Sequence, residues 1–369
     1  MSIAYTPGVA AVSQAISTNL AEAYNLTMKG NSVAIVSDGS AVLGLGDIGP
    51  EAALPVMEGK AILFKAFAGI DGVPVVVNAH STEEIITTVK TIAPTFGGIN
   101  LEDITAPKCF VIEAALQDIG IPVFHDDQHG TAIVLLAALE NAAKVVNKSL
   151  EELRVVVNGA GAAGIAIANL LRCVGHDPNV CVPVKDIYVC DSRGIISSDR
   201  TDLNPYKQTL LQHTNREKRS GNLQDALKDV DVFIGVSKGN LLGSDDITLM
   251  APDPIILAMA NPIPEIMPDV AKAAGAAVVG TGRSDFPNQV NNVLVFPGIF
   301  RGALDIRATK ITASMKIAAA RALAAAVEAV SAEKILPDPL DKTVAGIVAK
   351  AVKQTALAEG VVSKQTLPE

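Results

Sequence analysis

The chain has no tryptophan, and aromatic residues make up only 4% of its 369 residues. Because hydrophobic residues still account for 49%, the core must be aliphatic, as in parallel sheets covered by helices. Charged residues amount to 19%, which argues against extensive disorder. The net charge of −9 argues against nucleic acid as a main partner.

Signals that direct a chain to or across a membrane are also lacking. The start of the chain has neither the basic region nor the apolar region of a signal peptide. No uncharged apolar run reaches the length of about 18 residues that a membrane span needs. We therefore expect a cytoplasmic protein with neither a membrane nor a nucleic acid as partner.

Cysteine is scarce, and its spacing is uninformative. The four cysteines are Cys109, Cys173, Cys181 and Cys190. They form no CxxC pair and show no zinc-ligand spacing. We expect reduced, partly buried thiols, as is usual in a reducing compartment.

Short apolar strands alternate with helices, which predicts an α/β fold with parallel sheets. The predicted strands are 32–37, 72–78, 109–112, 121–124, 154–158, 186–190, 232–236, 255–260 and 276–280. The predicted helices are 82–92, 113–118, 130–146, 165–174, 223–228, 311–330 and 344–358, with a turn at 97–100. The length favours two domains, which we place at residues 1–130 and 131–369 with a cleft between them.

The most specific motif is a glycine-rich turn between a predicted strand and a predicted helix. Its GxGxxG pattern, in this context, is typical of a Rossmann-type dinucleotide-binding domain. The first glycine allows a tight turn, the second lets the backbone approach a pyrophosphate, and the third lets the helix pack on the strand. The predicted cofactor contacts are Gly159, Ala160, Gly161, Ala162, Ala163 and Gly164.

The next strand of this unit ends at Asp191, the candidate for binding the ribose hydroxyls. An acidic residue at this position favours NAD. Arg193, two residues later, is placed to meet a 2′-phosphate. The sequence therefore leaves both NAD and NADP open.

Two pairs of adjacent acids stand at unusual places. Glu102 and Asp103 follow the turn at 97–100, and Asp126 and Asp127 follow the strand 121–124. Acids at the end of a buried strand are costly unless they are paired or bind a cation. Oxygen ligands from two segments predict Mg²⁺ or Mn²⁺. The alternative is helix capping, with Asp127 capping a helix that begins near residue 130.

Several other side chains have two readings each. Lys60 and Lys65 lie in apolar runs, where a desolvated lysine has a lowered pKa and can act as a base, but a surface lysine fits as well. The hydroxyl of Tyr5 can act as an acid, or its ring can simply pack. His125 and His129 are expected to make structural hydrogen bonds rather than to ligate zinc.

Together these segments resemble the malic enzymes of the compact bacterial type. The matching stretches cover nearly the whole chain in order: AYTPGVA (4–10), DGSAVLGLGDIGP (38–50), PVMEGKAILFKAFAGID (55–71), PTFGGINLEDI (94–104), PVFHDDQHGTAI (122–133), GAGAAGIA (159–166), CDSRG (190–194), ANPIPEI (260–266) and TGRSDFPNQVNNVLVFPGIFRGALD (281–305). The resemblance implies oxidative decarboxylation of malate to pyruvate and CO₂, with reduction of NAD or NADP. It also implies a need for Mg²⁺ or Mn²⁺, and a homodimer.

The resemblance further implies roles for individual residues. Tyr5 corresponds to the general acid that protonates the enolate carbon. Lys60 corresponds to the base that takes the C2 hydroxyl proton, which requires a pKa lowered by burial or nearby cations. The implied metal ligands are Glu102, Asp103 and Asp127, with Asp126 supporting the site. The implied contacts with substrate and nicotinamide are Asn261 and Asn291.

The sequence also departs from this pattern. Ala41 stands where larger malic enzymes carry a substrate-binding arginine, so the carboxylate anchor is not assigned. Tyr5 lies close to the start of the chain, where a partner subunit is needed to hold it. Two other functions stay open: a metal-independent dehydrogenase of 2-hydroxy or amino acids, and a non-catalytic or truncated dinucleotide-binding protein.

Overall fold

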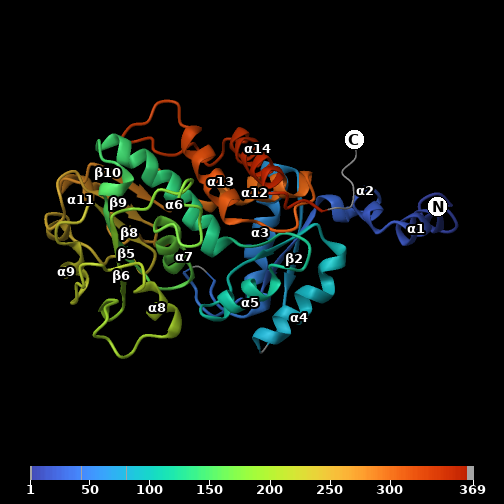
Figure 1. The fold of residues 1–369 in the computed structure, drawn as a ribbon, viewed down its shortest axis with the longest axis horizontal. Helices are drawn as coiled ribbons and strands as arrows, with labels where there is room; N and C mark the ends of the chain where they lie inside the picture. Colours follow the sequence, from blue (N-terminus) through green and yellow to red (C-terminus); the bar gives the residue numbers. More distant parts are fainter. Residues whose placement is uncertain (1, 43, 80, 364–369) are drawn as a thin grey trace.

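The computed structural model describes residues 2–42, 44–79 and 81–363, and its framework is two mainly parallel sheets with helices on their faces. Figure 1 shows the sheets side by side, with the first part of the chain in blue and cyan and the second in green to orange. The predicted α/β fold is therefore confirmed. The described residues contain no helix with the length and hydrophobicity of a membrane span.

The first sheet has four parallel strands in the order β2-β1-β3-β4. These are β1 (Ser32–Ser37), β2 (Asp71–Val76), β3 (Gly98–Leu101) and β4 (Val123–His125). The associated helices are α3 (Pro50–Ala68), α4 (Thr82–Ile92) and α5 (Lys108–Leu116). Every residue of β1 is buried, as expected for a strand inside a parallel sheet.

Two predictions in this region are wrong. Residues 109–112 belong to helix α5 and not to a strand. The buried residues of α5, Cys109, Ile112, Glu113 and Leu116, recur at the spacing of one helical face, which a four-residue apolar run does not reveal. Residues 98–101 form strand β3 and not a turn, because β3 pairs with both β1 and β4 in the middle of the sheet.

The second sheet has six strands in the order β10-β9-β8-β5-β6-β7. Its strands are β5 (Arg154–Asn158), β6 (Asp186–Asp191), β7 (Gly194–Ile195), β8 (Val232–Gly235), β9 (Ile255–Ala258) and β10 (Val278–Thr281), and only β7 is antiparallel. The strand order reverses at β5, which has β6 on one side and β8 on the other. Ligands of open α/β sheets bind in the crevice at such a reversal.

Long helices join the two sheets. Helix α6 (Asp126–Val145) leads from the first sheet to the second, and α7 (Ala162–Leu171) follows β5. Near the end of the chain, α12 (Phe296–Asp305), α13 (Ala313–Ala325) and α14 (Thr343–Ala358) return beside the first sheet. The ring of Phe64 on α3 lies 4.8 Å from that of Phe296 and 5.4 Å from that of Phe300 on α12. The shorter helices are α8 (Pro205–Leu210), α9 (Leu223–Leu227), α10 (Ser244–Ile247) and α11 (Pro268–Ala273).

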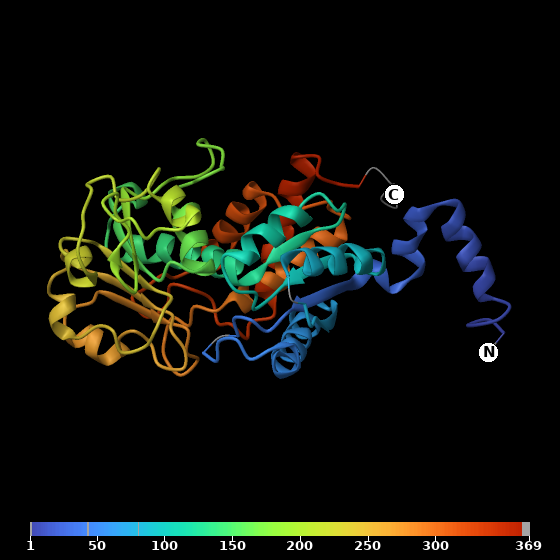
Figure 2. The ribbon, with the colours of Figure 1, turned by 90° about the horizontal axis from the view of Figure 1, so that it is seen from below.

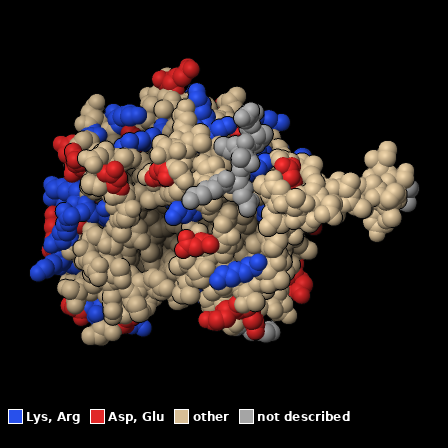
Figure 3. Space-filling view, turned by 45° about the vertical axis from the view of Figure 1, so that its right-hand side comes forward, with Lys and Arg blue, Asp and Glu red and all other residues tan. Residues whose placement is uncertain are grey.

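The N-terminal arm, residues 2–26, extends away from both sheets in Figures 1 and 2. It contains α1 (Val9–Thr18) and α2 (Ala23–Leu26), and no residue of α1 is buried. No charged residue occurs between residues 2 and 21, which is why the end of the arm carries neither red nor blue in Figure 3. The arm therefore presents an uncharged surface with little contact to the rest of its own chain.

The cysteines differ in part from the prediction. Cys173 and Cys181 form a disulfide, with Cα atoms 5.7 Å apart, so the expectation of reduced thiols is wrong for this pair. The loop after α7 turns back so that the amide of Val184 donates to the carbonyl of Leu171, which brings the two sulfur atoms together. Cys109 and Cys190 are free and buried.

Candidate active site

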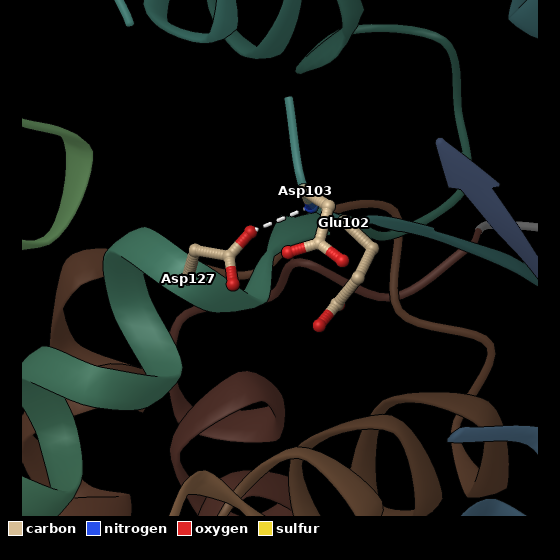
Figure 4. A group of neighbouring side chains, drawn as sticks. All are labelled: Glu102, Asp103 and Asp127. Carbon is tan, nitrogen blue, oxygen red and sulfur yellow. Dashed lines mark hydrogen bonds between the residues drawn. The ribbon is translucent and has the colours of Figure 1, made fainter. Parts of the chain in front are cut away.

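Carboxylates from two segments converge at the carboxyl ends of β3 and β4. Glu102 and Asp103 follow β3, whereas Asp127 lies in the first turn of α6, immediately after β4 (Figure 4). Oxygen atoms of the three side chains lie within 4.8 Å of one another. The Asp103 amide donates to Asp127 Oδ2 at 2.7 Å. Because α6 begins at Asp126, Asp127 does not cap a helix that starts near residue 130.

One of the two candidate lysines lies at this carboxylate cluster. Lys60, on α3, is buried, and its Nζ donates to Glu102 Oε1 at 2.5 Å and to Asp126 Oδ2. Nζ also lies 4.4 Å from the centre of the Phe296 ring. Lys65 is exposed and pairs with Asp71 at 2.7 Å. Lys60 is therefore the lysine placed for chemistry at the cluster.

The pKa of Lys60 does not follow the expectation from sequence. Burial acts to lower it, but the carboxylates of Asp126, Glu102 and Asp127 outweigh burial and raise the pKa above its ordinary value. The same burial raises the pKa of Glu102 and Asp126 to about 7 and that of Asp127 to about 6, against the influence of Lys60. The cluster thus holds more negative charge than one ammonium group compensates.

These residues fit a divalent cation. Besides the surplus of negative charge, Asp126 Oδ1 is buried and has no hydrogen-bond partner among the described residues. Buried acids of this kind are stable only when neutralised, and an all-oxygen ligand set suits Mg²⁺ or Mn²⁺. Glu102, Asp103 and Asp127 would hold the ion. Asp126 is instead fixed by Lys60 and by Asn292, whose Nδ2 donates to Oδ2 at 2.5 Å.

A cavity of about 490 Å³, here called the active cavity, lies between the two sheets. Asp103 and Asp127 line it from the first sheet, and residues 161–163 line it from the second. Asn261 and Asn291 also line it, which brings both predicted asparagines to the same space. Tyr5 is not among the described residues that line the active cavity, and it lies in the N-terminal arm with 68% of its surface exposed.

The active cavity offers amide side chains rather than basic ones among the described residues that line it. Ala41 lines the active cavity, and no lysine or arginine is among the described residues that line it. The amide side chains of Asn261, Asn291 and Asn292 are among the hydrogen-bond donors that line it. The sequence contained the signal for Asn292 in the doubled asparagine of QVNN, but only the first of the pair was predicted.

The glycine-rich turn has the geometry that a dinucleotide needs. Gly159 has φ +128°, and a Cβ atom at Gly164 would lie 1.7 Å from the Gly159 carbonyl oxygen. A Cβ atom at Gly161 would meet nothing within 4 Å, because this residue, just before α7, faces the active cavity. The room at Gly161 and the unpaired amides at the start of α7 fit a pyrophosphate.

Asp191 ends β6 as predicted, but it has partners that the sequence did not indicate. Arg200 binds its carboxylate through two hydrogen bonds of 2.8 and 3.0 Å, and Lys207 donates a third at 2.7 Å. Burial alone would raise the pKa of Asp191, but the hydrogen bonds from Arg200 and Lys207 lower it below its ordinary value. Arg193 pairs its side chain with Asp202 at 3.1 Å. Three cationic side chains thus lie near the expected ribose site.

Sequence reasoning also missed Glu265, which is completely buried. Its carboxylate accepts from the backbone amides of Ser237 at 3.1 Å and Ala260 at 3.0 Å. These two residues follow β8 and β9 and line the active cavity. Glu265 therefore fixes two loops at the carboxyl edge of the second sheet.

The two histidines do not line the active cavity. His125 is buried, and burial lowers its pKa to about 4. His129 contacts the carboxylate of Glu113 at 2.8 Å. His129 thus makes the expected structural contact, whereas neither ring nitrogen of His125 has a hydrogen-bond partner among the described residues, so the expectation is wrong for His125. Its Nδ1 lies 3.7 Å from Asp127 Oδ2.

The comparisons with known proteins agree with one another. The family model described as malic enzyme, N-terminal domain, matches residues 1–83, and the model described as malic enzyme, NAD binding domain, matches residues 128–357. The chain is 56% identical over 373 residues to a bifunctional malic/malolactic enzyme of Bacillus subtilis, covering 100% of this chain and 89% of that protein. It is 53% identical over 371 residues to an NAD-dependent malic enzyme of Geobacillus stearothermophilus, covering 100% and 76%.

A solved structure supports the same assignment. The malic enzyme from Pyrococcus horikoshii Ot3 superposes with a TM-score of 0.91 at 50% identity, covering 98% of this chain and 84% of that one. The match therefore extends from sequence to three-dimensional structure over almost the full length. The chain belongs to the malic enzyme family.

Proposed function

We propose that the protein catalyses the oxidative decarboxylation of malate to pyruvate and CO₂, with reduction of NAD or NADP and with Mg²⁺ or Mn²⁺ as the metal. One observation carries the proposal: Asp103 and Asp127, whose carboxylates suit a divalent cation, line the same cavity as the glycine-rich turn that suits a dinucleotide. We assign the metal and base chemistry to residues 1–130 and the binding of the dinucleotide to residues 131–369.

The proposed chemistry follows from the contacts of individual side chains. Lys60 takes the proton of the C2 hydroxyl, and Asp126 holds its Nζ in place. Asn261 and Asn291 orient the substrate and the nicotinamide by hydrogen bonds. When bound, the dinucleotide supplies the hydride acceptor, and the cation supplies stabilisation of negative charge on the substrate oxygens. A lysine acts as a base at neutral pH only if its pKa is lowered, so the charge of the neighbouring carboxylates, which raises the pKa of Lys60, must be offset. This is consistent with a requirement for a cation.

The direct test compares NAD with NADP in the presence of malate and Mn²⁺, each with and without EDTA. We expect reduced nicotinamide, followed by its near-ultraviolet absorbance, together with pyruvate, and we expect EDTA to abolish both. Reduction that resists EDTA would instead support the metal-independent dehydrogenase. Cofactor binding without any turnover would support the non-catalytic alternative.

We also propose a homodimer in which Tyr5 of one subunit serves as the general acid at the active cavity of the other. The N-terminal arm supports this proposal, because it is uncharged from residue 2 to residue 21 and leaves Ile3 89% and Tyr5 68% exposed. Exposed apolar side chains on a projecting segment are typical of a subunit interface.

Mixed subunits test the exchange of Tyr5. Tyr5→Phe and Lys60→Ala are each expected to be inactive, and each alone is expected to retain dinucleotide binding. In a heterodimer of the two variants, one site combines intact Lys60 with intact Tyr5, so random mixing is expected to restore about a quarter of the wild-type activity. Absence of any restoration, with heterodimers demonstrated by mass, would contradict the exchange.

A further inference from the structure

A second cavity of about 360 Å³, here called the rear pocket, lies between α5, α6, α7, α8 and α13. Its polar and aromatic lining consists of Phe110, Gln128, His129, Asn169, His176, Tyr206 and Lys316. The rear pocket and the active cavity share α6 and α7, but they share no lining residue. It is therefore a separate space on another face of the same two helices.

The rear pocket joins parts of the chain that are distant in sequence. Phe110 lies on α5, which is associated with the first sheet, and Tyr206 lies on α8, which belongs to the part of the chain that forms the second sheet. The centres of their rings lie 4.7 Å apart. Lys316 comes from α13 near the end of the chain. A molecule in this pocket would therefore contact both halves of the protein.

A carboxylate beside the rear pocket, that of Glu113, already has hydrogen-bond partners. Glu113 has its oxygens 2.8 and 2.9 Å from His129 Nε2, and Gln128 donates to it at 3.2 Å. Lys316, in contrast, makes no side-chain hydrogen bond or ion pair among the described residues. Burial lowers the pKa of Lys316, although the more distant Glu113 opposes this. Its ammonium group is thus largely desolvated and lacks a close counter-ion.

A second polar group in the rear pocket also lacks a partner. His176 Nδ1 is buried and has no hydrogen-bond partner among the described residues. The remaining walls are apolar and include Ile133, Ile165 and Leu170. A pocket with apolar walls and a few polar groups without partners is typical of a site for a small molecule.

We infer that the rear pocket binds a small organic carboxylate, whose charged group pairs with Lys316 and whose apolar body lies against the aliphatic wall. One ammonium group matches a single negative charge, and a phosphate dianion would be left with excess charge. His176 and Tyr206 offer further hydrogen bonds. The apolar wall favours a compact branched or aromatic body over a fully polar one.

Binding in the rear pocket is linked to the active cavity by two helices. Gln128 and His129 line the rear pocket on the same turn of α6 that presents Asp127 to the active cavity. Ile165 faces the rear pocket one turn beyond Ala162 on α7. Any shift of these turns changes both spaces, so the two ligands affect each other reciprocally. This linkage rests on the proposed function, whereas binding of the carboxylate does not.

Binding is tested by calorimetry with the metal-free, cofactor-free protein, using benzoate as the probe and benzamide as its uncharged counterpart. We expect benzoate to bind more tightly than benzamide. Lys316→Met is expected to weaken the binding of benzoate by about tenfold or more and to leave benzamide unchanged. Lys310→Met is the matched control, because Lys310 is exposed and lies outside the pocket. Ala313 also lines the pocket, so Ala313→Phe provides a second variant that fills the pocket while retaining Lys316.

The outcomes separate the two parts of the inference. Equal affinities for benzoate and benzamide, or benzoate binding that survives both Lys316→Met and Ala313→Phe, would overturn the site. The linkage predicts that saturating benzoate changes the affinity for NADH or Mn²⁺ in the wild type but not in Lys316→Met. Unchanged affinities in a protein that does bind benzoate would overturn the linkage. An inactive protein that nevertheless binds benzoate through Lys316 would contradict only the proposed function.

Discussion

Gly130 lies one helical turn after Asp126 on α6, and a Cβ atom at position 130 would stand 1.8 Å from Asp126 Oδ1. The absence of a side chain at Gly130 therefore allows Asp126 to reach Lys60 and Asn292. No other residue type fits at this position without moving the Asp126 carboxylate.

Gly130→Ala is expected to displace Asp126 and to lower kcat about a hundredfold, because a shift of about 1 Å near reacting groups has effects of that size. The fold is expected to persist, since alanine favours a helix. Steady-state turnover and thermal unfolding measure the two effects. Gly346→Ala on α14 is the control, because a Cβ atom there meets nothing within 4 Å, so turnover is expected to stay unchanged. Normal turnover in Gly130→Ala would show that the position of Asp126 is unimportant.

Asp127→Asn is expected to weaken the binding of Mn²⁺ by about tenfold to a hundredfold or more, because it removes a charged oxygen from the ligand group. Electron paramagnetic resonance of free Mn²⁺ measures this affinity without any need for turnover. Asp71→Asn removes an exposed acid of the same half of the protein and is expected to leave the affinity unchanged. If the two variants bind Mn²⁺ equally well, Asp127 is not a ligand.

Glu265→Gln keeps the size of the side chain but leaves one oxygen to accept from two amides. One of the amides of Ser237 and Ala260 then loses its partner, and we expect the free energy of unfolding to fall by about 1–3 kcal/mol. Binding of NADH, followed by fluorescence, is expected to weaken, while binding of Mn²⁺ persists. Glu333→Gln, an exposed acid paired with Lys272, is expected to change stability by less than about 1 kcal/mol. If both variants lower the free energy of unfolding equally, Glu265 does not stabilise the two loops through these hydrogen bonds.

Asp191→Asn tests how the contacts of Asp191 make the free energy of unfolding depend on pH. The pKa of Asp191 is lowered in the folded protein from its ordinary value of 3.8, so the folded state binds fewer protons than the unfolded state between the two values. The stabilisation is therefore fully present above pH 3.8 and is lost as the pH falls through the folded-state pKa. We expect wild type to exceed the variant in unfolding free energy at neutral pH and this difference to shrink below about pH 4. Asp118→Asn changes an exposed acid outside the ion pairs of the described residues and is expected to leave the unfolding free energy at neutral pH unchanged.

The sequence predicted best where the signal is local. The glycine turn was recognisable because strand, turn and helix are consecutive, and the α/β fold followed from the alternation of apolar segments. The strand assigned to residues 109–112 failed because four apolar residues fit either a buried strand or one face of a helix. The reverse error at 98–101 arose because two glycines indicate a turn, although pairing on both sides makes this segment a strand.

The parts of the site that the sequence did not predict depend on contacts between residues far apart in the chain. Arg200 reaches Asp191 from a loop and Lys207 reaches it from α8, and the carboxylate of Glu265 accepts from amides that follow two other strands. No spacing rule connects such residues. The disulfide between Cys173 and Cys181 likewise depends on how the loop folds back. The roles of Tyr5, Lys60, Asn261 and Asn291 remain predictions, and the mixed-subunit experiment tests those of Tyr5 and Lys60.

The raised pKa values of the buried acids make metal loading a proton-release reaction. With the pKa of Glu102 and Asp126 at about 7 and that of Asp127 at about 6, the cluster retains protons near neutral pH, and an arriving cation expels them. Calorimetric heats of Mn²⁺ binding should therefore vary with the ionisation enthalpy of the buffer. The slope of that variation counts the protons set free, and it should vanish in alkaline solution, where the acids have already lost them.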